Sequence, residues 1–112
     1  MISDTLSALA EPNRLHIVEL LRDNPRSVGE IVTELGLNQP QVSKHLKVLV
    51  EAGIVEVQKD AQRRIYKLKP QPLQELNTWL EPYRRIWEER FDRLDAFLQQ
   101  MQAPSEDNKP DT

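Results

Sequence analysis

The chain has 112 residues and no cysteine, with a net charge of −3, 38% hydrophobic residues and 29% charged residues. This composition is typical of one small globular domain, and the lack of cysteine excludes disulfides, thiolate metal sites and thiol catalysis. No apolar run approaches the ~18 residues that a membrane span requires, and the N-terminus lacks the order of a signal peptide. These features suit a cytoplasmic protein.

Charge is distributed unevenly along the sequence. Residues 1–37 carry a balance of −3 and residues 70–112 a balance of −4, whereas residues 38–69 carry seven basic and three acidic residues, a balance of +4. A polyanion responds to the local field more than to the net charge. The central block is therefore the candidate surface for nucleic acid.

Two helices are predicted in the N-terminal quarter. A short first helix, capped by Ser3, runs through Ala10. A second begins at Pro12, where a missing N–H costs nothing in a first helical turn, and ends at Asn24-Pro25. The buried stripe predicted for the second helix consists of Leu15, Ile17, Val18, Leu20 and Leu21.

The next two helices are joined by a short turn. Ser27 and Glu30 have the spacing of a capping box at the start of one helix, and Gly36 suits a left-handed cap at its end. The following helix has Pro40 in its first turn and is ended by Gly53. Two short helices around a glycine-containing turn predict a helix-turn-helix.

A β-hairpin is predicted immediately after these helices. Residues 54–59 and 64–68 resemble strands, separated by a polar turn at 60–63, and Val55 and Val57 alternate with polar residues as in a half-buried strand. The predicted fold is therefore mainly α with a small β-hairpin, a winged helix-turn-helix. The tip of its wing carries Lys59, Gln62, Arg63 and Arg64.

The helix at 39–52 has an apolar face and a second face without any carboxylate, which bears Gln39, Gln41, Ser43, Lys44 and Lys47. A solvated face is the default for an amphipathic helix. Recognition helices, however, read base edges with amide and basic side chains. The basic block, the glycine turn and the basic wing tip all favour a recognition helix over a merely solvated face. The sequence therefore predicts DNA binding.

Two motifs carry a resemblance to a known family. The opening motif is Leu9, Ala10, Glu11, Pro12 and Arg14, and the helix motif is Gln39, Pro40, Val42, Ser43, His45 and Leu46. With these motifs the chain resembles the ArsR (arsenic-repressor) family of bacterial winged-helix repressors over residues 5–68. Asn38 replaces the serine of the family pattern, and both are good N-caps. The segment after residue 71 is similar to the cysteine-free branch of that family.

The resemblance implies that Gln39, Pro40, Ser43 and Lys44 lie at the DNA, with wing residues on its backbone. The helical wheel adds two further residues of the polar face. The predicted DNA-binding set is Gln39, Pro40, Gln41, Ser43, Lys44, Lys47, Arg63 and Arg64. His45, at the edge of the apolar face, is predicted to pack, and His16 to be structural or exposed.

Residues 72–101 place apolar side chains at three- to four-residue spacing, interrupted by Pro82, which either kinks one helix or starts a second. One small domain cannot cover them all, so a homodimer built on the N- and C-terminal helices is predicted. Its interface is predicted to contain Leu80, Tyr83, Trp87, Phe91, Leu94 and Leu98. One domain is expected over 1–102, followed by a disordered tail at 103–112.

No catalytic order of residues, phosphate loop or metal-ligand spacing is present, so neither an enzyme nor a cofactor or metal site is predicted. The predicted function is a dimeric repressor on a palindromic operator. A ligand-responsive sensor repressor, controlled by a small molecule or a protein partner, remains an alternative. A winged helix used as a protein-interaction module is another.

Overall fold

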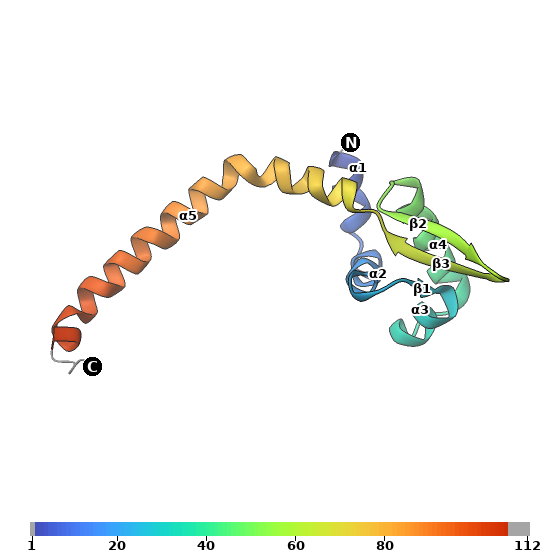
Figure 1. Ribbon diagram of the computed structural model, residues 1–112, viewed down its shortest axis with the longest axis horizontal. Helices are drawn as coiled ribbons and strands as arrows, with labels where there is room; N and C mark the ends of the chain where they lie inside the picture. Colours follow the sequence, from blue (N-terminus) through green and yellow to red (C-terminus); the bar gives the residue numbers. More distant parts are fainter. Residues whose placement is uncertain (1, 108–112) are drawn as a thin grey trace. The chain divides into compact units, whose positions relative to one another are not determined.

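The computed structural model describes residues 2–107, with side chains through residue 101. It divides into two compact units, Met1–Thr78 and Trp79–Thr112, which we call unit 1 and unit 2. The described elements are α1 (Ile2–Leu9), α2 (Pro12–Asp23), β1 (Arg26–Ser27), α3 (Val28–Leu35), α4 (Gln39–Glu51), β2 (Val55–Asp60), β3 (Arg63–Leu68) and α5 (Pro70–Asp107) (Figure 1).

The helix boundaries follow local capping signals. Pro12 occupies the first turn of α2, and the predicted capping box between Ser27 and Glu30 is present at α3. Gly36 ends α3 with φ 69°, a left-handed conformation that glycine adopts without steric cost. The predicted cap at Ser3 is wrong, because α1 already begins at Ile2 and Ser3 lies inside it.

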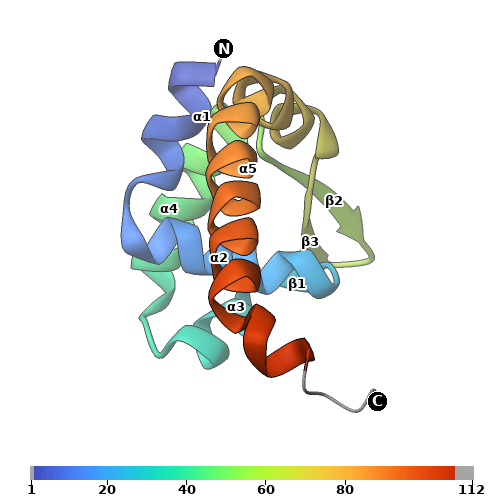
Figure 2. The ribbon, with the colours of Figure 1, turned by 90° about the vertical axis from the view of Figure 1, so that its left-hand side faces the viewer.

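Unit 1 contains a three-stranded antiparallel sheet with strand order β1-β3-β2. The predicted hairpin is confirmed as β2 and β3, and its turn is shorter than expected because Asp60 and Arg63 still pair across the strands. The prediction missed β1. This strand has only two residues, pairs Arg26 with Tyr66, and carries no local strand signal. Figure 2 shows the hairpin on one side of unit 1, with α1 on the opposite side.

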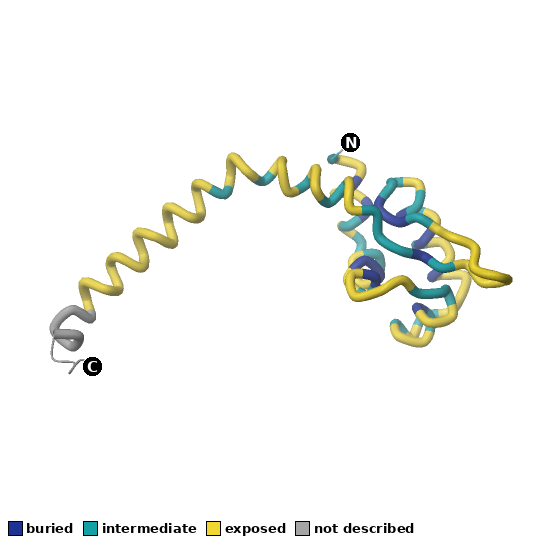
Figure 3. Tube along the Cα trace, in the orientation of Figure 1, coloured by how far each residue is buried: buried dark blue, intermediate teal, exposed yellow. Residues whose placement is uncertain are grey.

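The core of unit 1 lies between α2, α3, α4 and the sheet (Figure 3). Two predicted core positions are wrong: Leu15 and Val57 are each 41% exposed. Leu15 lies outside the stripe that α2 buries, and Val57 lies on the edge strand β2, two residues beyond the buried Val55 and in the part of the strand that the core leaves exposed. The buried core consists of Ala8, Ile17, Val18, Leu21, Ile31, Val42, Leu46, Leu49, Ile54, Val55 and Tyr66.

Helix α5 starts in unit 1 and continues through unit 2 as one helix, so Pro82 does not separate two helices. It extends to Asp107, and the predicted disordered tail therefore overlaps it; residues 108–112 lie outside the described residues. Among the residues described, no helix has both the length and the apolarity needed to cross a membrane.

Most residues of unit 2 that the structure describes are exposed (Figure 3), and they include large apolar residues. Their exposed fractions range from 38% at Trp87 to 63% at Met101. One intrahelical ring contact is present, between Trp79 and Tyr83 at a centroid distance of 5.0 Å. The exposed set is Trp79, Tyr83, Ile86, Trp87, Phe91, Leu94, Phe97, Leu98 and Met101.

Candidate nucleic-acid interface

Helix α4 separates its buried and exposed faces sharply. Val42, Leu46 and Leu49 are at most 1% exposed and anchor the helix against α2, α3 and β2. This anchoring directs the opposite side of the helix outward. All predicted contact residues on α4 are exposed, namely Gln39, Pro40, Gln41, Ser43, Lys44 and Lys47.

The first turn of α4 is held by a second capping box. Asn38 Oδ1 accepts from the Gln41 backbone N–H at 2.9 Å, and Gln41 Oε1 accepts from the Asn38 backbone N–H at 3.2 Å. The sequence interpretation recognised Asn38 as a cap but missed this role of Gln41. The Asn-x-x-Gln spacing, a variant of the capping-box pattern, was the signal that could have found it.

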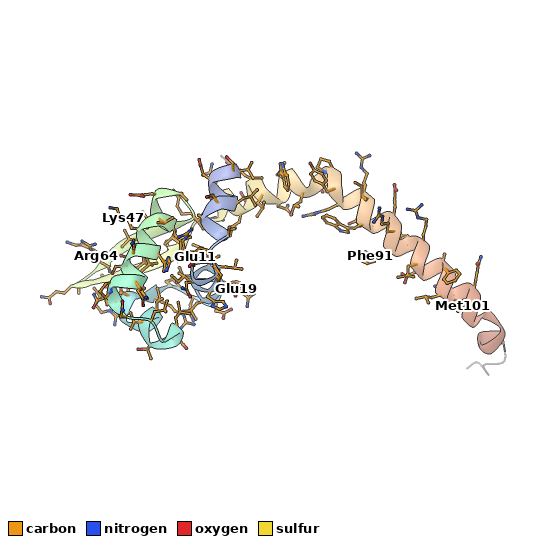
Figure 4. All side chains as sticks on the ribbon, turned by 180° about the vertical axis from the view of Figure 1, so that it is seen from behind. Glu11, Glu19, Lys47, Arg64, Phe91 and Met101 are labelled. Atoms are coloured by element: carbon orange, nitrogen blue, oxygen red, sulfur yellow. The ribbon has the colours of Figure 1, made fainter. Side chains whose placement is uncertain are left out.

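The wing, which we define as β2, β3 and their turn, brings its tip next to the start of α4. An open groove of about 400 Å³ is lined by Gln39 of α4, by Gln62, Arg63 and Arg64 of the wing, and by the first residues of α3. In the view of Figure 4, Lys47 and Arg64 lie toward the same edge of unit 1, away from Glu19. The two predicted parts of the DNA-binding set therefore border one surface.

The two wing arginines have different electrostatic surroundings. The Ser27 backbone N–H donates to Glu30 Oε1 at 2.8 Å, and this hydrogen bond lowers the pKa of the Glu30 carboxyl, with smaller contributions from the positive charges of Arg63 and Arg26. Arg63 also pairs in register with Asp60, whereas Arg64 pairs with Lys59. The Glu30 carboxylate therefore lies close enough to offset part of the charge of Arg63, whereas the cross-strand neighbour of Arg64 is another cation, Lys59.

His45 on α4 interacts electrostatically with the start of α2. It is half-buried, and its charge acts on Glu11, the residue that caps α2. Burial alone would raise the pKa of Glu11. Hydrogen bonds from the backbone N–H groups of Arg14 and Asn13 lower it instead, assisted by the positive charges of His45 and Arg14. The lowered pKa keeps Glu11 negatively charged, near His45 on α4.

His16 lies on α2 beside an open pocket of about 490 Å³ that several carboxylates also line. Among the residues that the structure describes, no group of three or more His, Cys, Asp or Glu is arranged to hold a metal ion. The absence of a metal site in the whole chain stays a prediction. The pocket is lined by His16, Glu19, Leu20, Asp23, Glu34 and Leu35.

Substitutions in the wing test which basic side chains contact DNA. Changing Arg64 to Ala should lower affinity equally on all sequences and reduce the slope of log affinity against log salt by about 0.9, the value for one phosphate contact. The matched change of Arg63 to Ala should reduce the slope less, because Glu30 already offsets part of its charge. Fluorescence anisotropy across a salt series measures both slopes. An unchanged slope for Arg64→Ala would remove the wing from the interface.

The structure contains a helix-turn-helix whose second helix exposes a basic face, and a β-hairpin with a basic tip follows it. These features define the class of winged-helix DNA-binding proteins. A family model described as "Bacterial regulatory protein, arsR family" matches residues 11–57. The chain belongs to this family and is a DNA-binding transcriptional regulator.

Comparisons with individual proteins agree with this assignment. The chain is 42% identical over 80 residues to the HTH-type transcriptional regulator Rv2034 of Mycobacterium tuberculosis, covering 71% of this chain and 72% of that protein. It is 43% identical over 65 residues to the HTH-type transcriptional repressor SmtB of the same organism, covering 58% of this chain and 48% of that protein, about half its length.

A solved structure extends the comparison to the fold. The transcriptional repressor BigR from Xylella fastidiosa aligns with a TM-score of 0.60 and 32% sequence identity. The alignment covers 73% of this chain and 85% of that one. A shared fold at this identity confirms the winged helix predicted from sequence.

Proposed function

We propose that this protein is a homodimeric transcriptional repressor that binds a palindromic operator through α4 and the wing. The observation that carries the proposal is the single exposed surface bordered by the polar face of α4 and the wing tip. SmtB and BigR, which are named as repressors, support repression as the outcome of binding. The dimer and the palindrome rest on further arguments.

The exposed apolar side chains of α5 support the proposal that a second copy of the chain covers them. Monomeric soluble proteins rarely expose contiguous apolar surface of this kind, and apolar patches mark association sites. Leu6 on α1 is also 41% exposed, which supports a contribution from the N-terminal helix. Among the interface residues predicted from sequence, Tyr83, Trp87, Phe91, Leu94 and Leu98 are exposed, and Leu80 is half-buried.

A two-fold dimer has a direct consequence for DNA recognition. It presents two copies of α4 related by the same symmetry, and such proteins bind half-sites separated by one helical turn of DNA or a multiple of it. A palindromic operator is the sequence that matches this symmetry. We therefore propose that each protomer reads one half-site.

The function is tested by selecting bound sequences from random duplexes at two salt concentrations. Enrichment of an inverted repeat, with affinity that falls steeply as salt rises, is the expected result. Selection without any enriched sequence would contradict sequence-specific repression. It would favour a winged helix that serves as a protein-interaction module.

Two lysines on the polar face of α4 give a residue-level prediction. Lys44→Ala and Lys47→Ala should each weaken binding of the selected operator without changing the melting temperature, because both side chains are exposed. If Lys44 pairs with guanine, its loss should also relax specificity at one position by about 1–3 kcal/mol. Fluorescence anisotropy measures the affinity. Wild-type affinity in both variants would show that this face does not meet the operator.

A further inference from the structure

One charged residue, Arg90, interrupts the stripe of exposed apolar side chains on α5. Tyr83, Arg90 and Phe97 follow one another at seven-residue spacing, about two helical turns, so they lie along one line of the helix. The residues four positions before and after Arg90 are Ile86 and Leu94, which are apolar and exposed. Arg90 thus lies near the middle of the surface that a second copy is proposed to cover.

No acidic residue of its own helix is placed to neutralise Arg90. Ion pairs on a helix join residues three or four positions apart. The residues at those positions around Arg90 are Ile86, Trp87, Arg93 and Leu94. Arg84 differs in this respect, because its guanidinium lies 3.7 Å from the carboxylate of Glu81. Since a buried charge without a partner is strongly unfavourable, covering the stripe requires a carboxylate from the second copy.

The position of Arg90 also restricts how two α5 helices can pair. In a parallel two-fold pair, residues near the middle of the contact meet their own copies, so the two Arg90 side chains would face each other. In an antiparallel pair each residue meets a different one, and the two Arg90 side chains separate unless the two-fold axis passes beside them. Because like charges repel in a buried contact, an antiparallel pair with its axis away from Arg90 is favoured.

Glu75 is the acidic residue of α5 that matches this geometry. An antiparallel two-fold pair brings the same side of the two helices together, so the partner of Arg90 must come from Arg90's own side of α5. Glu75 is exposed and lies roughly 60° from Arg90 around the helix, at 100° per residue. Every other acidic residue of α5 through residue 101 lies at least roughly 100° from Arg90.

This pairing determines one alignment of the two copies. If Arg90 of each copy meets Glu75 of the other, the two-fold axis crosses α5 midway between them, just before Tyr83. Arg84 and Glu81 have the same midpoint, so the same alignment brings Arg84 of each copy level with Glu81 of the other. One alignment therefore places both arginines beside carboxylates of the second copy.

We propose that Arg90 sets the alignment of the homodimer by forming an ion pair with Glu75 of the second copy, in an antiparallel pair of α5 helices. The inference rests on the proposed function, in which the protein is a homodimer. A single alignment fixes the separation of the two α4 helices, and with it the spacing between half-sites of the operator. Arg90 thereby contributes to operator recognition as a positioning residue.

The test reverses the two charges singly and together in the full-length protein. Arg90→Glu and Glu75→Arg should each raise the dimer dissociation constant about tenfold or more, because each brings like charges together twice in the dimer. The double variant Arg90→Glu, Glu75→Arg should return to the wild-type value. Sedimentation over a concentration series measures these constants. Neither reversal creates like charges at helical spacing, and circular dichroism checks that the helix content is unchanged.

A matched double variant keeps the same net charge but moves the arginine to the other side of the stripe. Asp95 is exposed and lies roughly 140° from Arg90 around the helix. Arg90→Glu, Asp95→Arg should therefore remain as weak a dimer as Arg90→Glu alone. Arg90→Leu should stay dimeric but accept more than one half-site spacing in selection from random duplexes, because an apolar residue no longer excludes other alignments.

The outcomes separate the inference from the proposed function. Wild-type dissociation constants in both single reversals, or a double reversal that fails to restore the dimer, would overturn the ion pair and leave the homodimer intact. A single, unchanged half-site spacing in Arg90→Leu would show that other residues set the alignment. A wild-type protein that sediments as a monomer at micromolar concentration would contradict the proposed homodimer, and the inference with it.

Discussion

Replacing Phe91 and Leu94 with glutamate is expected to convert the protein into a monomer and to lower its operator affinity by about a hundredfold or more. In the single chain these side chains are 61% and 50% exposed. Fully burying such a side chain contributes about 1.5–3 kcal/mol, and a two-fold interface contains each residue twice. Because only about half of each side chain is left to bury, the summed loss is roughly 3–7 kcal/mol, which is a large part of the association energy of a micromolar dimer, about 8 kcal/mol.

The control for this change adds the same charges to the other side of the helix. Ala96→Glu and Gln99→Glu lie well away from the apolar stripe at helical spacing, and both positions are exposed. This double variant should remain dimeric. Analytical ultracentrifugation reports the mass of each variant, and anisotropy reports operator binding. A stable dimer of the Phe91→Glu, Leu94→Glu variant would show that unit 2 is not the dimer interface.

The second large effect concerns the stability of unit 1. Leu21→Ala should lower the free energy of unfolding by about 2–5 kcal/mol, because a buried leucine loses both its transfer energy and its packing. Leu21 is 3% exposed, whereas Leu15 on the same helix is 41% exposed. Leu15→Ala is therefore expected to cost less than about 1 kcal/mol. Urea denaturation followed by circular dichroism compares the two variants, and equal losses would contradict the assignment of the buried stripe.

For a domain with a total stability of about 5–15 kcal/mol, the expected loss in Leu21→Ala is a large fraction. The variant should consequently bind its operator weakly at temperatures where the wild type is folded. This loss of binding has a different signature from the loss in Lys44→Ala, since it should track the unfolded fraction. Measuring affinity at several temperatures below the melting transition separates the two causes.

The sequence by itself determined the features that depend on residues within one helical turn. Pro12 in a first turn, the box from Ser27 to Glu30 and the left-handed cap at Gly36 all follow from hydrogen bonds or backbone preferences within three or four positions. The helix-turn-helix and hairpin could therefore be predicted, and with them a basic surface. The role of Gln41 in the cap is equally local, since its partner Asn38 lies three residues away, but the polar face of the helix by itself predicts only a DNA contact for Gln41.

Only the tertiary structure decided the features that depend on distant partners. Strand β1 exists because Arg26 and Ser27 pair with Tyr66 and Ile65, and two residues carry no periodicity of their own. Val57 alternates correctly yet is exposed, because only the start of the edge strand β2, at Val55, is covered by the core, and the strand is exposed from Val57 to its end. Likewise, the sequence of α2 shows several apolar residues, but the positions of its neighbours decide which of them are buried. Burial is a property of packed elements, and no single segment specifies it.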